Sequence, residues 1–260
     1  MSYFQSSSGK VFFGESGVGD PLVFIHGRTL DSRMWKPQVD FLKSKYRCIT
    51  YDLSGFGKSD LPKNGYDPVQ TLKELFDHLN LSKATVIALS LGTHVAINFA
   101  LEYPNFISKL VLMSCTVPGA EASKEFMEDW DKVESAGNIG DFLTAKDMWL
   151  NCKAFQNLKI NNKDNYKLFL EMINDYTCWD IHNAPSKLSR PGVVDRLAEI
   201  TASTLVVSGE KDYSDFVKNG DLLGSKLPNS KVVKIKESGH MINFEFPDVT
   251  NKLILDFLSS

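Results

Sequence analysis

Three side chains far apart in the chain have the chemistry of a nucleophile, an acid and a base. They are Ser90, Asp212 and His240, and each follows an apolar segment with the composition of a buried strand. A serine hydroxyl is a weak nucleophile at neutral pH unless a base accepts its proton, and that base needs an acid to orient it. If the fold brings the three together, they predict acyl transfer through the serine.

The strongest local pattern surrounds Ser90. Residues 84–92 read Ala-Thr-Val-Ile-Ala-Leu-Ser-Leu-Gly, an apolar strand that passes through one serine into an apolar helix. Such a sharp turn strains the serine backbone and tolerates only small residues two positions away, which here are Ala88 and Gly92. The first amides of a helix also favour negative charge. The segment therefore predicts an exposed hydroxyl beside a site that stabilises an oxyanion.

The elements around these residues alternate between strand and helix. Apolar strand-like runs occupy residues 22–25, 46–51, 84–89, 109–113, 204–207 and 231–236, and helix-length segments occupy 33–43, 68–79, 91–103, 213–227 and 247–258. Alternation of this kind is typical of an α/β fold, in which a mostly parallel, doubly wound sheet is flanked by helices. Ligands bind at the carboxyl ends of such strands, so Ser90, Asp212 and His240 are expected to converge there.

The strand pattern is interrupted between residues 117 and 194. This stretch is helical and charged in character, and it contains Trp130, Trp149 and Trp179, three of the four tryptophans. We expect a core domain formed by residues 1–116 and 195–260, with residues 117–194 inserted as a helical cap or lid. The default expectation for the three tryptophans is packing within the cap rather than lining of a pocket.

Composition excludes several classes of protein. The 260 residues are 43% hydrophobic, enough for a sizeable core, and the net charge of −3 leaves no basic excess for nucleic acid. Four cysteines without a Cys-x-x-Cys pair indicate buried reduced thiols, with no metal site. The amino terminus lacks the pattern of a secretory signal, and no apolar run is long enough for a membrane span. The expectation is a cytoplasmic protein with no membrane span, no nucleic-acid partner and an oligomeric state that the sequence does not give.

Five segments occur in an order known from one superfamily. They are the His26-Gly27 turn, the loop Asp-Leu-Ser-Gly-Phe-Gly-Lys-Ser at 52–59, Ser90, Asp212 in a Gly-x-x-Asp turn, and His240 in a Ser-Gly-His turn. With them the chain resembles the α/β-hydrolase superfamily across essentially its whole length. The resemblance implies that Ser90 is the nucleophile, Asp212 the acid and His240 the base, and that no cofactor is needed. Ala88 departs from it, because that position is usually glycine.

The resemblance also implies an oxyanion hole made of two backbone amides. The matching positions are Arg28 and Leu91, with Thr29 as the alternative to Arg28. Glu210 and Asp215 compete with Asp212 for the role of acid, but both are expected to be solvated charges. His26 is expected to brace the loop that follows it.

Arg28 is unusual, since the residue after His-Gly is usually apolar in this superfamily. Its side chain is either an attractor for an anionic substrate group or a solvated charge.

These features favour a serine hydrolase that cleaves a small carboxylic ester or lactone. A serine at the nucleophile position excludes the dehalogenases and epoxide hydrolases of the superfamily, which have aspartate there. Carbon–carbon bond hydrolysis is less expected, because Arg28-Thr-Leu-Asp31 stands where those enzymes have glycine and proline. The same triad would also serve a thioesterase, a perhydrolase or a slow-turnover ligand receptor.

Overall fold

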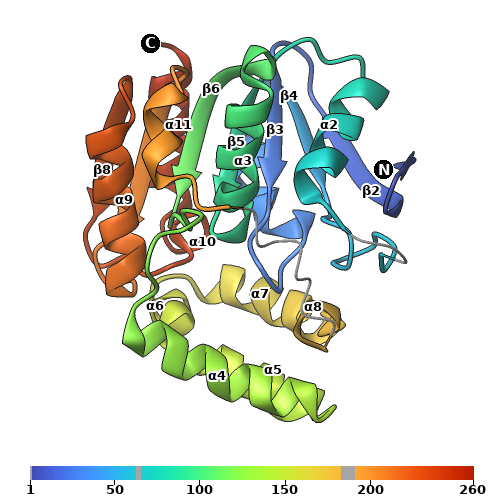
Figure 1. The fold of residues 1–260 in the computed structure, drawn as a ribbon, viewed down its shortest axis with the longest axis vertical. Coiled ribbons are helices and arrows are strands. Elements are labelled where there is room, and N and C mark those ends of the chain that lie inside the picture. Colours follow the sequence, from blue (N-terminus) through green and yellow to red (C-terminus); the bar gives the residue numbers. More distant parts are fainter. Residues whose placement is uncertain (1, 63–65, 183–190) are drawn as a thin grey trace.

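The computed structural model describes residues 2–62, 66–182 and 191–260. Within these residues, eight strands form one sheet in the order β1-β2-β4-β3-β5-β6-β7-β8 (Figure 1). The strands are β1 Ser2–Ser6, β2 Gly9–Ser16, β3 Pro21–Ile25, β4 Arg47–Tyr51, β5 Ala84–Leu89, β6 Ile107–Met113, β7 Ser203–Gly209 and β8 Ser230–Ile235. From β4 to β8 all neighbouring strands are parallel, which confirms the predicted sheet.

The first two strands were not predicted. β1 pairs with β2 and β2 with β4, both antiparallel. These strands lie at one edge of the sheet and mix serine, glycine and charged residues with their aromatic ones, so they lack the continuous apolar pattern of the centre. In contrast, β5 is buried at every position, as a central strand covered on both faces must be.

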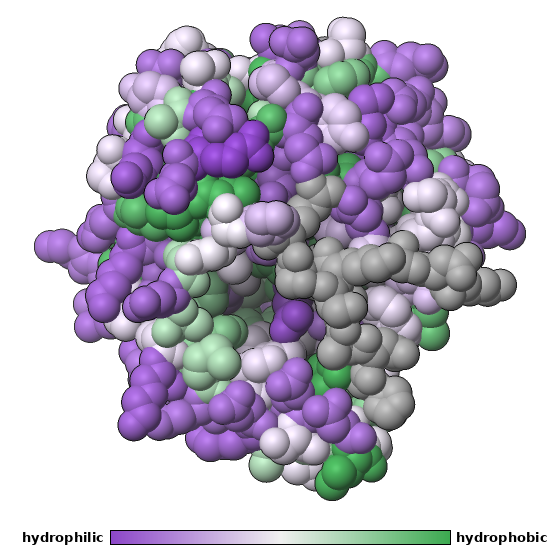
Figure 2. Space-filling view, in the orientation of Figure 1, coloured by the Kyte–Doolittle hydropathy of each residue, from purple (hydrophilic) through white to green (hydrophobic). Residues whose placement is uncertain are grey.

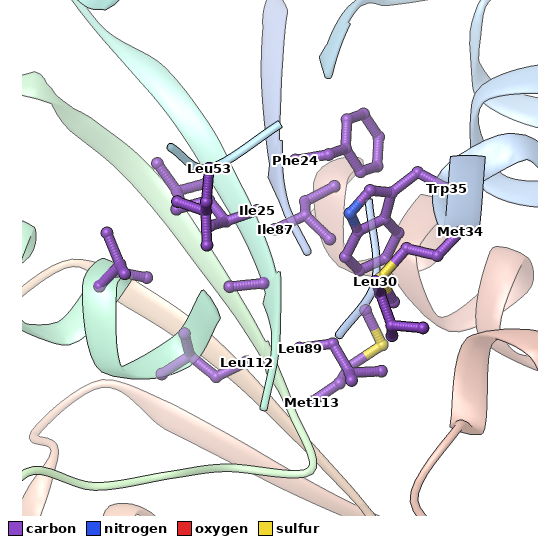
Figure 3. Packing of buried hydrophobic residues seen from close by; sticks show 14 of the residues in the cluster. Phe24, Ile25, Leu30, Met34, Trp35, Leu53, Ile87, Leu89, Leu112 and Met113 are labelled. Carbon is purple, nitrogen blue, oxygen red and sulfur yellow. The ribbon is translucent and has the colours of Figure 1, made fainter. Parts of the chain in front are cut away.

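Helices α1 Lys36–Leu42, α2 Pro68–His78, α3 Leu91–Glu102, α9 Ser214–Lys226 and α11 Pro247–Leu258 cover the sheet (Figure 1). Of these, α1 packs against α11, α2 packs against α3, and α9 packs on β7 and β8. The helix predicted over residues 33–43 is divided into a 3-10 turn, η1 Ser32–Trp35, and α1. Figure 3 shows Trp35 of η1 beside Phe24 in the core, with the ring centroids 5.3 Å apart.

In the described part of the segment after β6, five helices precede the return of the chain to the sheet. They are α4 Lys124–Asn138, α5 Phe142–Leu150, α6 Lys153–Asn161, α7 Lys163–Asp175 and α8 Trp179–His182, and η3 Val194–Glu199 then leads into β7. Figure 1 shows these inserted helices below the sheet, at the ends toward which its parallel strands point. Residues 183–190 of the predicted 117–194 segment lie outside the described residues.

Candidate active site

Ser90 lies between β5 and α3 in a backbone conformation that residues other than glycine rarely adopt. Its φ is 53° and its ψ is −119°. Its N–H donates to the carbonyl of Met113 at 3.0 Å, and its carbonyl accepts from the N–H of Thr93 at 2.8 Å. The sheet and the helix thus both hold the strained residue in place, as the sequence pattern predicts.

Gly92 shows why the position two residues after the serine must be small. A Cβ placed there would lie 2.4 Å from the carbonyl oxygen of Ile25 and 2.9 Å from that of His26. Both are backbone atoms of the neighbouring strand and loop, so they have little freedom to move away. Ala88, on the other side of Ser90, is fully buried within β5, where its methyl group is accommodated.

We therefore expect Gly92→Ala to lower the free energy of unfolding by about 1–3 kcal/mol, because the added methyl overpacks this contact. The measurement is chemical denaturation. Gly14→Ala is the matched control, since its Cβ would meet Thr50 Oγ1 at an ordinary 3.4 Å. If Gly92→Ala were as stable as the wild type, the carbonyl groups of Ile25 and His26 could move aside without loss of stability.

Asp212 and His240 lie together in the turns that follow β7 and β8. The two turns are joined by backbone hydrogen bonds, including one of 2.8 Å from the N–H of Lys211 to the carbonyl of Ser238. His240 Nδ1 lies 2.8 Å from Asp212 Oδ2, and both residues are buried. The other carboxylate oxygen of Asp212 accepts from the N–H of Tyr213 at 2.8 Å. With Nδ1–H donating to the carboxylate, Nε2 of His240 is the nitrogen able to accept a proton.

The two competing acids have different surroundings. Glu210 is exposed, as predicted. The prediction of a solvated charge is wrong for Asp215, which is only 6% exposed. Its Oδ1 accepts from the hydroxyl of Ser123 at 2.7 Å, at the start of inserted helix α4. Sequence position next to a polar turn did not reveal this burial, because it depends on a helix from a distant segment.

A second buried acid near His240 was missed by the sequence analysis. Glu245, in the short helix α10 Ile242–Glu245, accepts from the N–H of Gly239 at 2.7 Å and from that of Met241 at 3.1 Å. Burial raises the pKa of Glu245. By holding the amides on both sides of His240, Glu245 fixes the turn that presents the imidazole. A lone glutamate in the apolar run Met-Ile-Asn-Phe-Glu-Phe was the available indication.

Ser90 and His240 line the same cavity, which has a volume of about 260 Å³. Arg28 and Leu91, the positions matched to the oxyanion hole, line it as well. Figure 2 shows a recess at the level where the inserted helices meet the sheet. Asp212 is behind His240, in contact with its Nδ1. The structure therefore places all five predicted site residues at one location.

Thr29, the alternative to Arg28, has other contacts. Its φ is 65°, its hydroxyl donates to the carbonyl of Arg28 at 2.6 Å, and Trp149 Nε1 donates to the same hydroxyl at 2.8 Å. Thr29 is buried and, unlike Arg28, is not among the residues that line the cavity, so Arg28 stays the predicted position of the two. Trp149 packs against Trp130 and Phe155 and also lines the cavity, so for this one tryptophan the default expectation of packing within the cap is incomplete.

His26 braces the loop after β3, as predicted. Its Nδ1–H donates to the carbonyl of Gly27 at 2.7 Å, and its Nε2 accepts from the N–H of Leu53 at 2.8 Å. Both ring nitrogens are satisfied only in the neutral form, and complete burial lowers the pKa of His26. The ring thereby ties the Arg28 loop to the loop after β4.

The Arg28 side chain is paired with an acid and partly buried, with 27% of it exposed. Its Nε lies 3.1 Å from Oδ2 of Asp180, a buried residue of α8, and its guanidinium lies over the ring of Trp130 at 4.3 Å. Asp180 also accepts from the hydroxyl of Tyr176. The charge of Arg28 is thus paired with an acid from an inserted helix, and its attraction for an anionic substrate group stays a hypothesis.

Comparison with known proteins agrees with the fold. The model of the alpha/beta hydrolase fold family matches residues 20–247, so the chain belongs to this family of hydrolases. A 2-hydroxy-6-oxononadienedioate/2-hydroxy-6-oxononatrienedioate hydrolase of Comamonas testosteroni is 28% identical, over 98% of this chain and 93% of that protein. The 3-oxoadipate enol-lactonase 1 of Acinetobacter baylyi is 26% identical, over 92% and 88%.

Among solved structures, a malate-bound thermophilic esterase from Thermogutta terrifontis superimposes with a TM-score of 0.86. It is 24% identical, and the match covers 99% of this chain and 97% of that one. This similarity is one of fold.

Two further features of the described residues are the length of their helices and the state of their cysteines. None of the helices in residues 2–62, 66–182 and 191–260 is long and apolar enough to cross a membrane. The four cysteines are buried thiols without disulfides, as predicted. Burial raises the pKa of Cys48 to about 12, far from that of a reactive thiolate.

Proposed function

We propose that this α/β-hydrolase cleaves small carboxylic esters or lactones by acyl transfer through Ser90, His240 and Asp212. The observation that carries the proposal is the 2.8 Å contact between His240 and buried Asp212, with His240 and the strained Ser90 lining one cavity. This arrangement supports a base, an orienting acid and a nucleophile in one site.

The proposed first half of the reaction forms an acyl-enzyme. His240 Nε2 accepts the proton of Ser90 while Oγ attacks the substrate carbonyl carbon. The negative charge that develops on the carbonyl oxygen is stabilised by the amides of Arg28 and Leu91. His240 then donates its proton to the leaving alcohol oxygen, and the bond between that oxygen and the acyl carbon breaks.

In the second half, water takes the place of the alcohol. His240 accepts a proton from the water, whose oxygen attacks the acyl carbon, and then returns the proton to Ser90 as the acid leaves. Asp212 keeps Nδ1 protonated throughout, so that Nε2 faces the reacting atoms. These steps need no metal or organic cofactor.

We further propose that residues 117–194 act as a cap over a core of residues 1–116 and 195–260. Phe126 of α4 and Phe155 of α6 line the cavity together with Ser90, so the inserted helices contribute walls of the site. These walls support an apolar acyl or alcohol group of modest size. The name of the Acinetobacter baylyi enol-lactonase is consistent with lactone hydrolysis.

The test is steady-state turnover of p-nitrophenyl esters from C2 to C12 and of a set of small lactones. We expect many turnovers per enzyme, with the fastest rates on short to medium chains because the cavity is about 260 Å³. A single burst without further turnover would contradict the proposal and favour a slow-turnover receptor. Turnover of 2-hydroxy-6-oxononadienedioate, the compound in the name of the Comamonas testosteroni relative, without ester or lactone turnover would favour carbon–carbon bond hydrolysis instead.

A further inference from the structure

One wall of the active cavity is polar and comes from α9. Asp215 and Asn219 lie one helical turn apart on this helix, and both line the cavity. They are 6% and 8% exposed. Phe216, which follows Asp215, has its ring centroid 4.4 Å from that of His240, so this wall lies beside the proposed triad.

Both side chains already form hydrogen bonds within the protein, and the groups that remain available to a ligand are mainly acceptors. Asp215 Oδ1 accepts from Ser123, and the carboxylate has no hydrogen to donate. Asn219 Nδ2 donates to the carbonyl of Cys115 at 2.9 Å, which directs the amide nitrogen toward the protein. A buried carboxylate is costly unless donors surround it. A ligand that brings an O–H or N–H group to this wall would supply such a donor.

The charges of the residues that line the cavity also favour a donor group over a carboxylate on the ligand. Arg28 is the one lysine or arginine that lines it among the described residues, and Asp180 compensates that charge. Glu121 adds a second, exposed carboxylate to the lining. The described lining residues thus include two carboxylates, those of Asp215 and Glu121, and one arginine that is already paired with Asp180. A substrate carboxylate beside Asp215 would meet like charge.

We propose that Asp215 and Asn219 form a subsite for a hydrogen-bond donor, a hydroxyl or an ammonium, on the substrate, and that this subsite selects against substrates with a free carboxylate. The inference rests on the proposed ester or lactone hydrolysis and adds the class of substrate. Asp215 acts in binding and takes no part in proton transfer.

The test uses butyrate esters of four alcohols that differ in one end group: pentyl, 4-hydroxybutyl, 4-aminobutyl and 3-carboxypropyl. A second series of methyl esters carries the same end groups on the acyl chain. All measurements are made at pH 8, at which the 4-aminobutyl group is an ammonium ion. In at least one series we expect kcat/KM of the hydroxyl and ammonium esters to exceed that of the carboxylate ester by about tenfold or more.

The Asp215→Asn variant removes the charge with little change of shape. We expect the ratio of kcat/KM for the ammonium ester to that for the carboxylate ester to fall by about tenfold. Asp131→Asn, on the exposed face of α4, makes the same change in net charge and is expected to leave the ratio as in the wild type. An equal ratio in wild type and Asp215→Asn, or a wild type that prefers the carboxylate esters in both series, would overturn the proposal.

A binding experiment distinguishes failure of this subsite from failure of the proposed hydrolysis. The same esters can be titrated calorimetrically into Ser90→Ala, with and without Asp215→Asn. One outcome is that the donor-bearing esters bind preferentially, that this preference depends on Asp215, and that the wild type turns over no ester. This outcome would reject the hydrolysis and keep the subsite. Turnover without any end-group preference would reject the subsite and keep the hydrolysis.

Discussion

Ser90→Ala is expected to reduce the rate of ester turnover by about 10⁶-fold, the scale on which loss of a serine nucleophile acts in serine hydrolases. Alanine leaves His240 and Asp212 in place but removes the only atom that can form the acyl-enzyme in the proposed mechanism. The substitution also keeps a side chain that fits the strained turn. The measurement is kcat on the best p-nitrophenyl ester, with thermal denaturation to show that the fold is retained.

Ser208→Ala is a matched control for that experiment. Ser208 is a buried serine at the end of β7, and its hydroxyl has no hydrogen-bond partner in the part of the chain that the structure describes. Removing this hydroxyl is expected to leave kcat unchanged. If Ser90→Ala kept wild-type turnover, the acyl-enzyme mechanism would be wrong, whatever the substrate.

Asp212→Asn is expected to lower kcat by about 10⁴-fold, as loss of the correct histidine tautomer does in serine proteases. In the wild type the carboxylate accepts from His240 Nδ1 at 2.8 Å. An asparagine can instead donate its N–H to Nδ1, which moves the proton to Nε2 and leaves no acceptor for the hydroxyl of Ser90. The hydrogen bond from the N–H of Tyr213 can persist to the amide oxygen, so the fold is expected to survive.

Glu210→Gln tests the second candidate acid in the same turn. Glu210 is exposed, and we expect its neutralisation to leave kcat within about twofold of the wild-type value, since surface charges are strongly screened. If Asp212→Asn kept wild-type turnover and Glu210→Gln lost most of it, Glu210 rather than Asp212 would be the acid that orients His240.

The elements at the centre of the sheet and the turn at Ser90 could be read from the chain itself. Strands buried on both faces require continuous apolar runs, and a strand-to-helix turn with positive φ requires small neighbours, so both leave local patterns. The edge strands β1 and β2 leave no such pattern, because they combine polar residues with aromatic ones and depend on pairing to each other and to β4. Their presence follows from tertiary pairing.

The surroundings of the site depended on contacts between distant segments. Asp215 is buried because α4 packs over it and Ser123 donates to it, and Arg28 is compensated because α8 brings Asp180 to its side chain. Neither partner could be inferred from local sequence, since pairs separated by about 90 and 150 residues leave no periodicity. The residue types of the triad and their order were thus encoded locally, whereas burial and charge pairing, which set the polarity of the cavity, arose only when the inserted helices packed against the sheet.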